Sequence, residues 1–219
     1  MYSNINTLSE QSFATCLQNG AVLFDARLPE EFINSFIPGA IFVGPSEKNW
    51  RIAVSLFNND SKVILILPEV AVEDKISKTS SINIEGYLEG GFSNYLDAKN
   101  EIDLLIEIEA DEFAMDIPFD ANMLILDVRE PDDFEKEHVK TALNIPLSDM
   151  GDLAQIAGLE ENQNIYLYGE DVIESVMAAS LLKRQGYNNL RVIKGGWQQI
   201  KTEPSIAFKK ESTTLKGKK

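Results

Sequence analysis

The sequence is poor in the residues that build disulfides and metal centres. Its 219 residues include one cysteine, Cys16, and one histidine, His138. A lone cysteine cannot form an internal disulfide, and one cysteine with one histidine cannot supply the four ligands of a structural zinc site. We therefore expect neither a bound metal nor a cofactor.

Long apolar runs are missing too. No run approaches the roughly 20 residues needed to cross a bilayer. The first residues do not combine a basic start with an apolar stretch, so no secretory signal is expected. Together with the unpaired thiol of Cys16, this favours a reducing cytoplasm as the location.

Positive charge is scarce. Lysine and arginine number 20 against 35 aspartates and glutamates, which gives a net charge of −15. Residues 209–219 hold five lysines and one glutamate, so the rest of the chain carries −19. Such a surface repels nucleic acid and anionic membranes, because binding to both rests on neutralising phosphates. We predict neither as a partner and interpret 209–219 as a basic, flexible tail.

What the chain does have is an internal repeat. Residues 25–32 read Asp-Ala-Arg-Leu-Pro-Glu-Glu-Phe, and residues 127–134 read Asp-Val-Arg-Glu-Pro-Asp-Asp-Phe, at an offset of 102. A Gly-Gly-aromatic triplet ends each copy, at 90–92 and 195–197. A repeat this long indicates duplicated domains rather than a solenoid.

The duplication sets the expected domain boundaries. We predict a first domain over residues 1–100, a second over 101–208, and the tail over 209–219. Apolar residues at 44% and charged residues at 25% are ordinary for folded domains of this size.

Short apolar strands alternate with helices in both copies. A Thr7-x-x-Glu10 capping box predicts a helix through about Leu17, and prolines predict helix starts at Pro29 and Pro131. Strands are expected at 21–24, 41–43, 63–67, 124–126, 143–145 and 165–168, and a further helix at about 174–185. This pattern predicts an α/β fold of two three-layer α/β/α domains, each with a mostly parallel sheet of about five strands.

These motifs resemble the rhodanese-homology family. The Asp-x-Arg motif after a strand, the Ile37-Pro38-Gly39-Ala40 turn and the later Gly-Gly-aromatic triplet occur in the family's order, and largely twice. The segments 87–92 and 109–116 resemble one subfamily more closely, the rhodanese pair at the C-terminal half of metallo-β-lactamase-fold hydrolases. That resemblance implies a hydrolase domain, or another protein, as partner. The histidine-rich zinc motif of such hydrolases is absent here.

The resemblance also implies where the chemistry would lie. Rhodaneses carry sulfur on a cysteine just after the central strand, in a loop that reads Cys-x-x-Gly-x-Arg-Ser and leads into a helix. Amides at that helix start favour a thiolate and an anionic substrate. In the second copy the equivalent loop is Gly169, Glu170, Asp171, Val172, Ile173, Glu174 and Ser175. Gly169 therefore stands at the nucleophile position and Glu174 at the arginine position.

The first copy lacks the nucleophile as well. Its equivalent positions are Leu67, Pro68 and Glu69. Cys16 belongs to the first helix, where a partly buried small apolar residue is the simpler interpretation. We therefore predict no catalytic residue and a binding or regulatory role.

Several alternatives stay open. A sulfurtransferase could act through a non-standard cysteine, and the carboxylates of 170–174 could bind a cation. Asp25 with Arg27, and Asp127 with Arg129, are interpreted as structural pairs at strand ends. His138 is interpreted as a turn residue.

Overall fold

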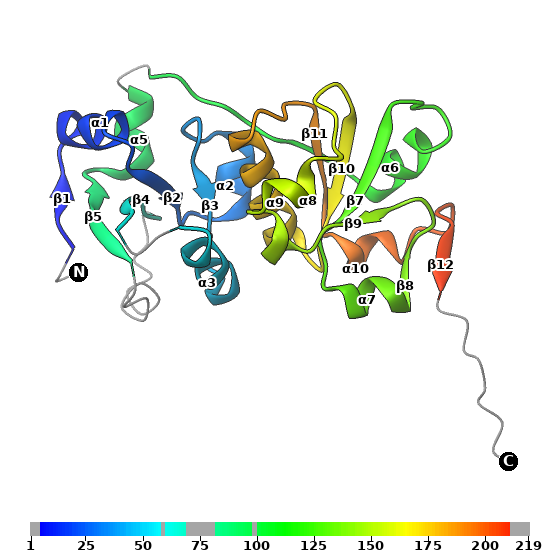
Figure 1. The fold of residues 1–219 in the computed structure, drawn as a ribbon. Coiled ribbons are helices and arrows are strands. Elements are labelled where there is room, and N and C mark those ends of the chain that lie inside the picture. Colours follow the sequence, from blue (N-terminus) through cyan, green and yellow to red (C-terminus); the bar gives the residue numbers. More distant parts are fainter. Residues whose placement is uncertain (1–4, 58–59, 69–81, 98–99, 211–219) are drawn as a thin grey trace, which may run out of the picture.

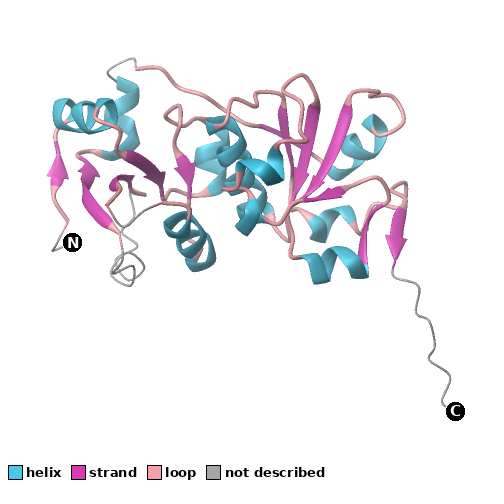
Figure 2. Ribbon diagram, in the orientation of Figure 1, coloured by secondary structure: helices cyan, strands magenta, loops and turns pink. Residues whose placement is uncertain are grey.

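Two parallel five-stranded sheets form the protein. The structure is a computed structural model, and it describes residues 5–57, 60–68, 82–97 and 100–210. In Figures 1 and 2 the two groups of strands lie side by side, with helices between and around them. The strand orders are β1-β5-β4-β2-β3 and β6-β11-β10-β7-β9, and every neighbouring pair is parallel. The predicted α/β fold class is confirmed.

The first sheet is built from the N-terminal part of the chain. Its strands are β1 (Thr7–Leu8), β2 (Val22–Asp25), β3 (Ile41–Phe42), β4 (Lys62–Ile66) and β5 (Asn83–Leu88). Its helices are α1 (Glu10–Gln18), α2 (Pro29–Asn34), α3 (Glu47–Ser55) and α5 (Gly91–Asp97). The central strands β2 and β4 are almost wholly buried, as expected of parallel strands covered on both faces.

The second sheet repeats the arrangement. Its strands are β6 (Ile106–Ile108), β7 (Met123–Asp127), β9 (Leu143–Asn144), β10 (Asn164–Tyr168) and β11 (Leu190–Ile193). Its helices are α6 (Ala110–Asp116), α7 (Pro131–Lys136), the 3₁₀ turn η1 (Leu147–Asp149), α8 (Leu153–Ile156), α9 (Val172–Arg184) and α10 (Trp197–Ile200).

One expected helix start is wrong. Thr7 lies in β1, and the N-cap of α1 is Ser9, whose hydroxyl accepts a hydrogen bond from the Ser12 amide at 3.3 Å. A serine is as good an N-cap as the predicted threonine, because its hydroxyl can accept a hydrogen bond from a first-turn amide. Parallel pairing of β1 with β5 then holds Thr7 in extended backbone.

Helix α9 lies between the two sheets. Residues Ser175 to Leu182 are buried without interruption, which is typical of a helix covered on all sides. It packs on β10 and β11 of its own sheet and on β3 of the first sheet. One apolar core therefore contains residues from both halves, for example Phe42 of β3 and Met177 of α9.

Polar contacts from α9 also join the two parts. The Phe42 amide donates to the Ser180 hydroxyl at 3.0 Å, and Arg184 donates to the Gly39 carbonyl at 3.0 Å. Lys183 pairs at 2.9 Å with Asp103, which itself bridges to Phe36. The helix that follows the 169–171 loop is thus fixed by residues of the first half.

The last described residues belong to a small, two-stranded third sheet. Strand β12 (Phe208–Lys210) pairs antiparallel with β8 (Glu137–Val139), which places Lys209 opposite His138. His138 is therefore a buried strand residue rather than a turn residue, and its ring stacks on Phe134 at 3.7 Å. Lys209 and Lys210, which the sequence predicts to begin a flexible tail, lie in β12 instead because they pair with β8, and residues 211–219 lie outside the described residues. No helix in the described part of the chain is long and apolar enough to cross a membrane.

Candidate functional site

The candidate site is the loop between β10 and α9. Strand β10 ends at Tyr168, and α9 begins at Val172 with Asp171 as its N-cap. The Asp171 side chain accepts a hydrogen bond from the Glu174 amide at 3.1 Å. Because this cap makes the first turn regular, the helix starts two residues before the predicted 174.

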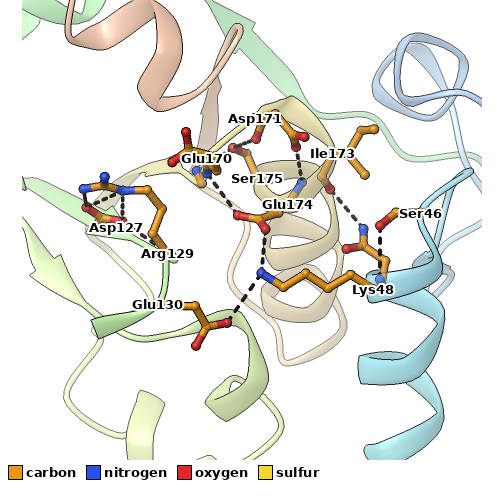
Figure 3. Close-up of polar contacts among 12 residues, drawn as sticks. Ser46, Lys48, Asp127, Arg129, Glu130, Glu170, Asp171, Ile173, Glu174 and Ser175 are labelled. Atoms are coloured by element: carbon orange, nitrogen blue, oxygen red, sulfur yellow. Dashed lines mark hydrogen bonds and ion pairs between the residues drawn. The ribbon is translucent and has the colours of Figure 1, made fainter. Parts of the chain in front are cut away.

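Side chains from the first turn of α9 occupy the amides of this loop (Figure 3). The Gly169 amide donates to the Ser175 hydroxyl at 2.8 Å, and the Glu170 amide donates to Glu174 Oε2 at 3.0 Å. The Ser175 hydroxyl donates in turn to the Asp171 carbonyl at 2.9 Å. The Gly169 and Glu170 amides are therefore hydrogen-bonded within the loop.

Gly169 is closely confined. A Cβ atom at this position would lie 2.6 Å from Glu174 Cβ and 3.0 Å from Glu174 Oε2. The backbone φ of Gly169 does not lie in the left-handed region, so the restriction comes from these contacts and from the Ser175 amide nitrogen at 3.3 Å rather than from backbone strain. Any side chain at position 169 would therefore need Glu174 to move.

A lysine from the first half holds Glu174 in place. Lys48 of α3 lies 2.7 Å from Glu174 Oε1 and 3.4 Å from Glu130 Oε1 (Figure 3). Burial lowers the pKa of Lys48, but the hydrogen bond and charge of Glu174, together with the charge of Glu130, outweigh burial. The pKa therefore lies above its ordinary value of 10.5, and Lys48 stays a cation.

Asn49 makes a second contact between α3 and α9. Its amide Nδ2 donates to the Ile173 carbonyl at 3.3 Å, and the side chain is fully buried. Its Oδ1 has no hydrogen-bond partner within the described ranges. The first turn of α9 is thus approached by two consecutive side chains of α3.

The Asp-x-Arg motifs form buried ion pairs at the ends of the central strands. Arg129 contacts both oxygens of Asp127, the shorter distance being 2.6 Å, and Arg27 contacts Asp25 in the same way at 2.7 Å. Burial lowers the pKa of Arg129, but Asp127 outweighs burial and raises it above its usual range.

The remaining guanidinium surface in each motif is used for packing. Arg129 lies 4.0 Å from the centre of the Trp197 ring, and Arg27 lies 3.7 Å from the Phe92 ring. Each also donates to a carbonyl, that of Glu137 or of Ser35. Both pairs are fully engaged within the fold, which matches the structural interpretation.

The equivalent position in the first half is only partly described. Leu67 is buried just after β4, Pro68 follows it, and Glu69 lies outside the described residues. The Leu67 carbonyl lies 3.7 Å from the point where a Cβ on Gly91 would stand.

Cys16 lies on α1, in the first half of the chain. Its thiol is partly buried and packs against the apolar core, as expected from the sequence. None of the hydrogen bonds described for the 169–175 loop involves α1.

The acidic residues of the loop do not form a ligand set. Glu174 is bound by Lys48, Asp171 caps α9, and Glu170 accepts a hydrogen bond from Gln198. Within the ranges that the structure describes, no group of three or more carboxylate, histidine or cysteine side chains could hold a metal ion. The convergence assumed for a cation site is therefore not found.

Sequence reasoning missed the α3 residues. Lys48 and Asn49 follow Ser46, the N-cap of α3, whose hydroxyl accepts from the Asn49 amide at 3.3 Å. A Ser-x-x-Asn start gives a helix signal, but nothing in the sequence pairs that helix with residues about 125 positions later.

Comparison with known proteins finds a family model that matches part of the chain. The rhodanese-like domain model matches residues 109–203. YrkF of Bacillus subtilis (strain 168) is 34% identical over 84 residues, which are 38% of this chain and 44% of YrkF. Thiosulfate sulfurtransferase PspE of Escherichia coli (strain K12) is 31% identical over 65 residues, 30% of this chain and 62% of PspE. The chain thus spans less than two thirds of either relative.

Among solved structures, the rhodanese-like domain of the Alr3790 protein from Anabaena sp. is similar. It is 26% identical, covers 52% of this chain and 86% of its own, and has a TM-score of 0.45. The family match coincides with the second sheet, its helices and the 169–175 loop. Residues 109–203 are therefore similar to rhodanese-like domains.

Proposed function

We propose that this chain is a catalytically inactive tandem rhodanese-like protein that serves as a binding or regulatory module. The observation that carries the proposal is Gly169. It follows the central strand β10 where the family resemblance puts the sulfur-carrying cysteine, and a glycine has no side chain to accept sulfur. Glu174, at the expected arginine position, would repel an anionic donor such as thiosulfate.

Similarities between the two halves support the tandem arrangement. Both sheets have the same strand order. Strands β2 and β7, which occupy equivalent places in the two sheets, each end in a buried Asp–Arg pair. Both halves also carry two consecutive glycines with positive φ, at 90–91 and at 195–196. We assign the first domain to residues 1–100 and the second to 101–208.

The partner is proposed from the subfamily resemblance. Segments 87–92 and 109–116 resemble the rhodanese pair of metallo-β-lactamase-fold hydrolases. The module would then be the accessory half of such a hydrolase in thiol or persulfide metabolism in the cytoplasm. Capture of the tagged native protein, followed by peptide mass spectrometry, tests this. A stoichiometric hydrolase supports it, and capture of the 24.5 kDa chain alone counts against it.

The alternative is a sulfurtransferase that uses a non-standard cysteine. PspE, which matches 30% of this chain, is named a thiosulfate sulfurtransferase. In this chain only Cys16 could carry the sulfur, because it is the sole cysteine. A mass increase of one sulfur on Cys16 after thiosulfate treatment would favour this alternative.

Thiosulfate:cyanide sulfur transfer tests the main proposal. We expect the wild-type chain and Cys16→Ser to produce thiocyanate at the same rate as buffer. Turnover by the wild type that Cys16→Ser abolishes would establish the alternative. Turnover that survives Cys16→Ser would refute the inactive assignment outright.

A further inference from the structure

The 169–175 loop contains its own anion. The Glu174 carboxylate accepts a hydrogen bond from the Glu170 amide with Oε2, and its Oε1 contacts the Lys48 ammonium (Figure 3). The side chain is 13% exposed, although glutamates in the first turn of a helix usually extend into water. Both carboxylate oxygens are thus used, one by the loop and one by the first half of the chain.

We propose that Glu174 is an internal ligand of the loop, locked in place by Lys48, and that it closes this position to external oxyanions. The proposal rests on the proposed function only in treating the loop as a former sulfur-transfer site. In this proposal the loop holds the Glu174 carboxylate, and Lys48 of the first half keeps it there.

The electrostatics of the position favour an anion. The Glu170 amide and the N-terminal end of the α9 dipole attract negative charge, and Lys48 adds a full positive charge. Hydrogen bonds between charged groups are about twice as strong as neutral ones. Glu174 answers all three attractions from within the chain, so it needs no free ligand.

An external anion would have to displace Glu174. The displaced carboxylate would lose Lys48 and the Glu170 amide together, and Glu130 would then be the nearest charge left on Lys48. A tethered group has a large advantage of effective concentration over a free ion. The wild-type loop is therefore expected to ignore millimolar anions.

Removal of Glu174 should leave an anion-binding site at the position that its carboxylate occupies. Glu174→Ala leaves the Glu170 amide without its acceptor and leaves Lys48 with the longer Glu130 contact, and both donors can then bind a small divalent oxyanion. Sulfate is the probe, since it is tetrahedral, redox-inert and doubly charged. Glu47→Ala is the matched control, because it also removes one carboxylate at a helix start and leaves the loop intact.

The experiment compares melting temperatures in sulfate and in chloride at equal ionic strength. Sulfate stabilises all folded proteins somewhat by exclusion from their surface, so only the difference between variants counts. We expect Glu174→Ala to gain about 3 °C more than the wild type and Glu47→Ala at saturating sulfate. The gain should disappear in Lys48→Met/Glu174→Ala.

Two outcomes would overturn the proposal. One is an equal sulfate response in the wild type, Glu174→Ala and Glu47→Ala. The other is a gain that survives the loss of Lys48, because the ammonium would then play no part in the site.

Hydrogen exchange gives a second test that does not need Glu174→Ala to fold. The Glu170 amide should exchange slowly in the wild type and several-fold faster in Lys48→Met. Rapid exchange in the wild type, or no change in Lys48→Met, would contradict the lock. Neither test measures sulfur transfer, so failure here is distinguishable from failure of the proposed function.

Discussion

The amide of Phe42 donates a 3.0 Å hydrogen bond to the hydroxyl of Ser180, across 138 positions of sequence. Phe42 ends the edge strand β3 of the first sheet, and Ser180 lies in the middle of α9 in the second half. Both residues are fully buried. The edge of one sheet is thus closed by a helix of the other half, so the two halves should unfold together.

Ser180→Ala tests this coupling. The substitution leaves the buried Phe42 amide without an acceptor, which should lower the free energy of unfolding by about 1–3 kcal/mol. Urea denaturation followed by circular dichroism measures the change. Ser55→Ala is the control, because the Ser55 hydroxyl contacts only the Ile52 carbonyl at an exposed position, and it should change stability by less than about 0.5 kcal/mol. Equal effects would contradict the coupling.

Gly169→Ala tests how tightly Glu174 fills the loop. The new Cβ would meet Glu174 Cβ at 2.6 Å, so we expect a loss of about 1–3 kcal/mol in the free energy of unfolding. Gly158→Ala is the control, since a Cβ there has no heavy atom within 4 Å.

The cause can be isolated with a double-mutant cycle. If the Glu174 side chain causes the clash, Gly169→Ala should cost little in a Glu174→Gly background, which removes the Cβ as well as the carboxylate, and the interaction energy should exceed about 0.5 kcal/mol. Additive effects would assign the cost to some other neighbour.

Arg129→Leu tests the buried pair at the end of β7. It leaves Asp127 buried without a cation, and breaking a buried pair in this way typically costs about 3–5 kcal/mol. Chemical denaturation measures the loss. Arg51→Leu removes an arginine that is 73% exposed and paired only with Glu47 at 3.7 Å, so it should cost at most about 0.5 kcal/mol. A small effect of Arg129→Leu would refute the structural role of the pair.

The Lys48 ion pair should give a pH dependence at the alkaline end. Because the pKa of Lys48 is raised above 10.5 in the folded chain, its contribution is fully present below that pH and is lost as pH rises through the higher folded value. The stability difference between the wild type and Lys48→Met should therefore stay constant from about pH 8 to about pH 10 and shrink above it.

Urea midpoints across this range measure the effect, with Lys48→Arg as the matched control. An arginine keeps its charge at these pH values, so the difference between Lys48→Arg and Lys48→Met should persist. Loss of the wild-type advantage near neutral pH would contradict the predicted direction.

The elements of each half could be predicted because their signals are local. Alternating strands and helices, the two Pro-started helices α2 and α7, and the Asp-x-Arg pairs all follow from patterns within a few residues. The capping box at Thr7 failed because tertiary pairing with β5 took Thr7 into a strand, and Ser9 served as the cap instead. His138 was misplaced for the same reason, since its partner strand β12 lies about 70 residues later.

The position of the candidate site could be predicted from the sequence, but the hydrogen bonds and ion pairs within it could not. Alignment of the α9 sequence was enough to pick out Gly169 and Glu174. That Glu174 bends back onto the Glu170 amide, and that Lys48 reaches it from the first half, depends on how α9 packs against β3. No local pattern encodes that packing. The carboxylates looked like a cation site in sequence because their separate partners were not visible.

The most direct test of the central claim is the rate of thiosulfate:cyanide sulfur transfer by the full chain, measured beside E. coli PspE as an active standard. With Gly169 at the position that the family resemblance assigns to the nucleophile, and with Glu174 bound to the Glu170 amide, we predict thiocyanate formation no faster than in buffer, for the wild type and for Cys16→Ser alike. Turnover by the wild type at a rate comparable to PspE would contradict the account, whether or not Cys16→Ser abolishes it.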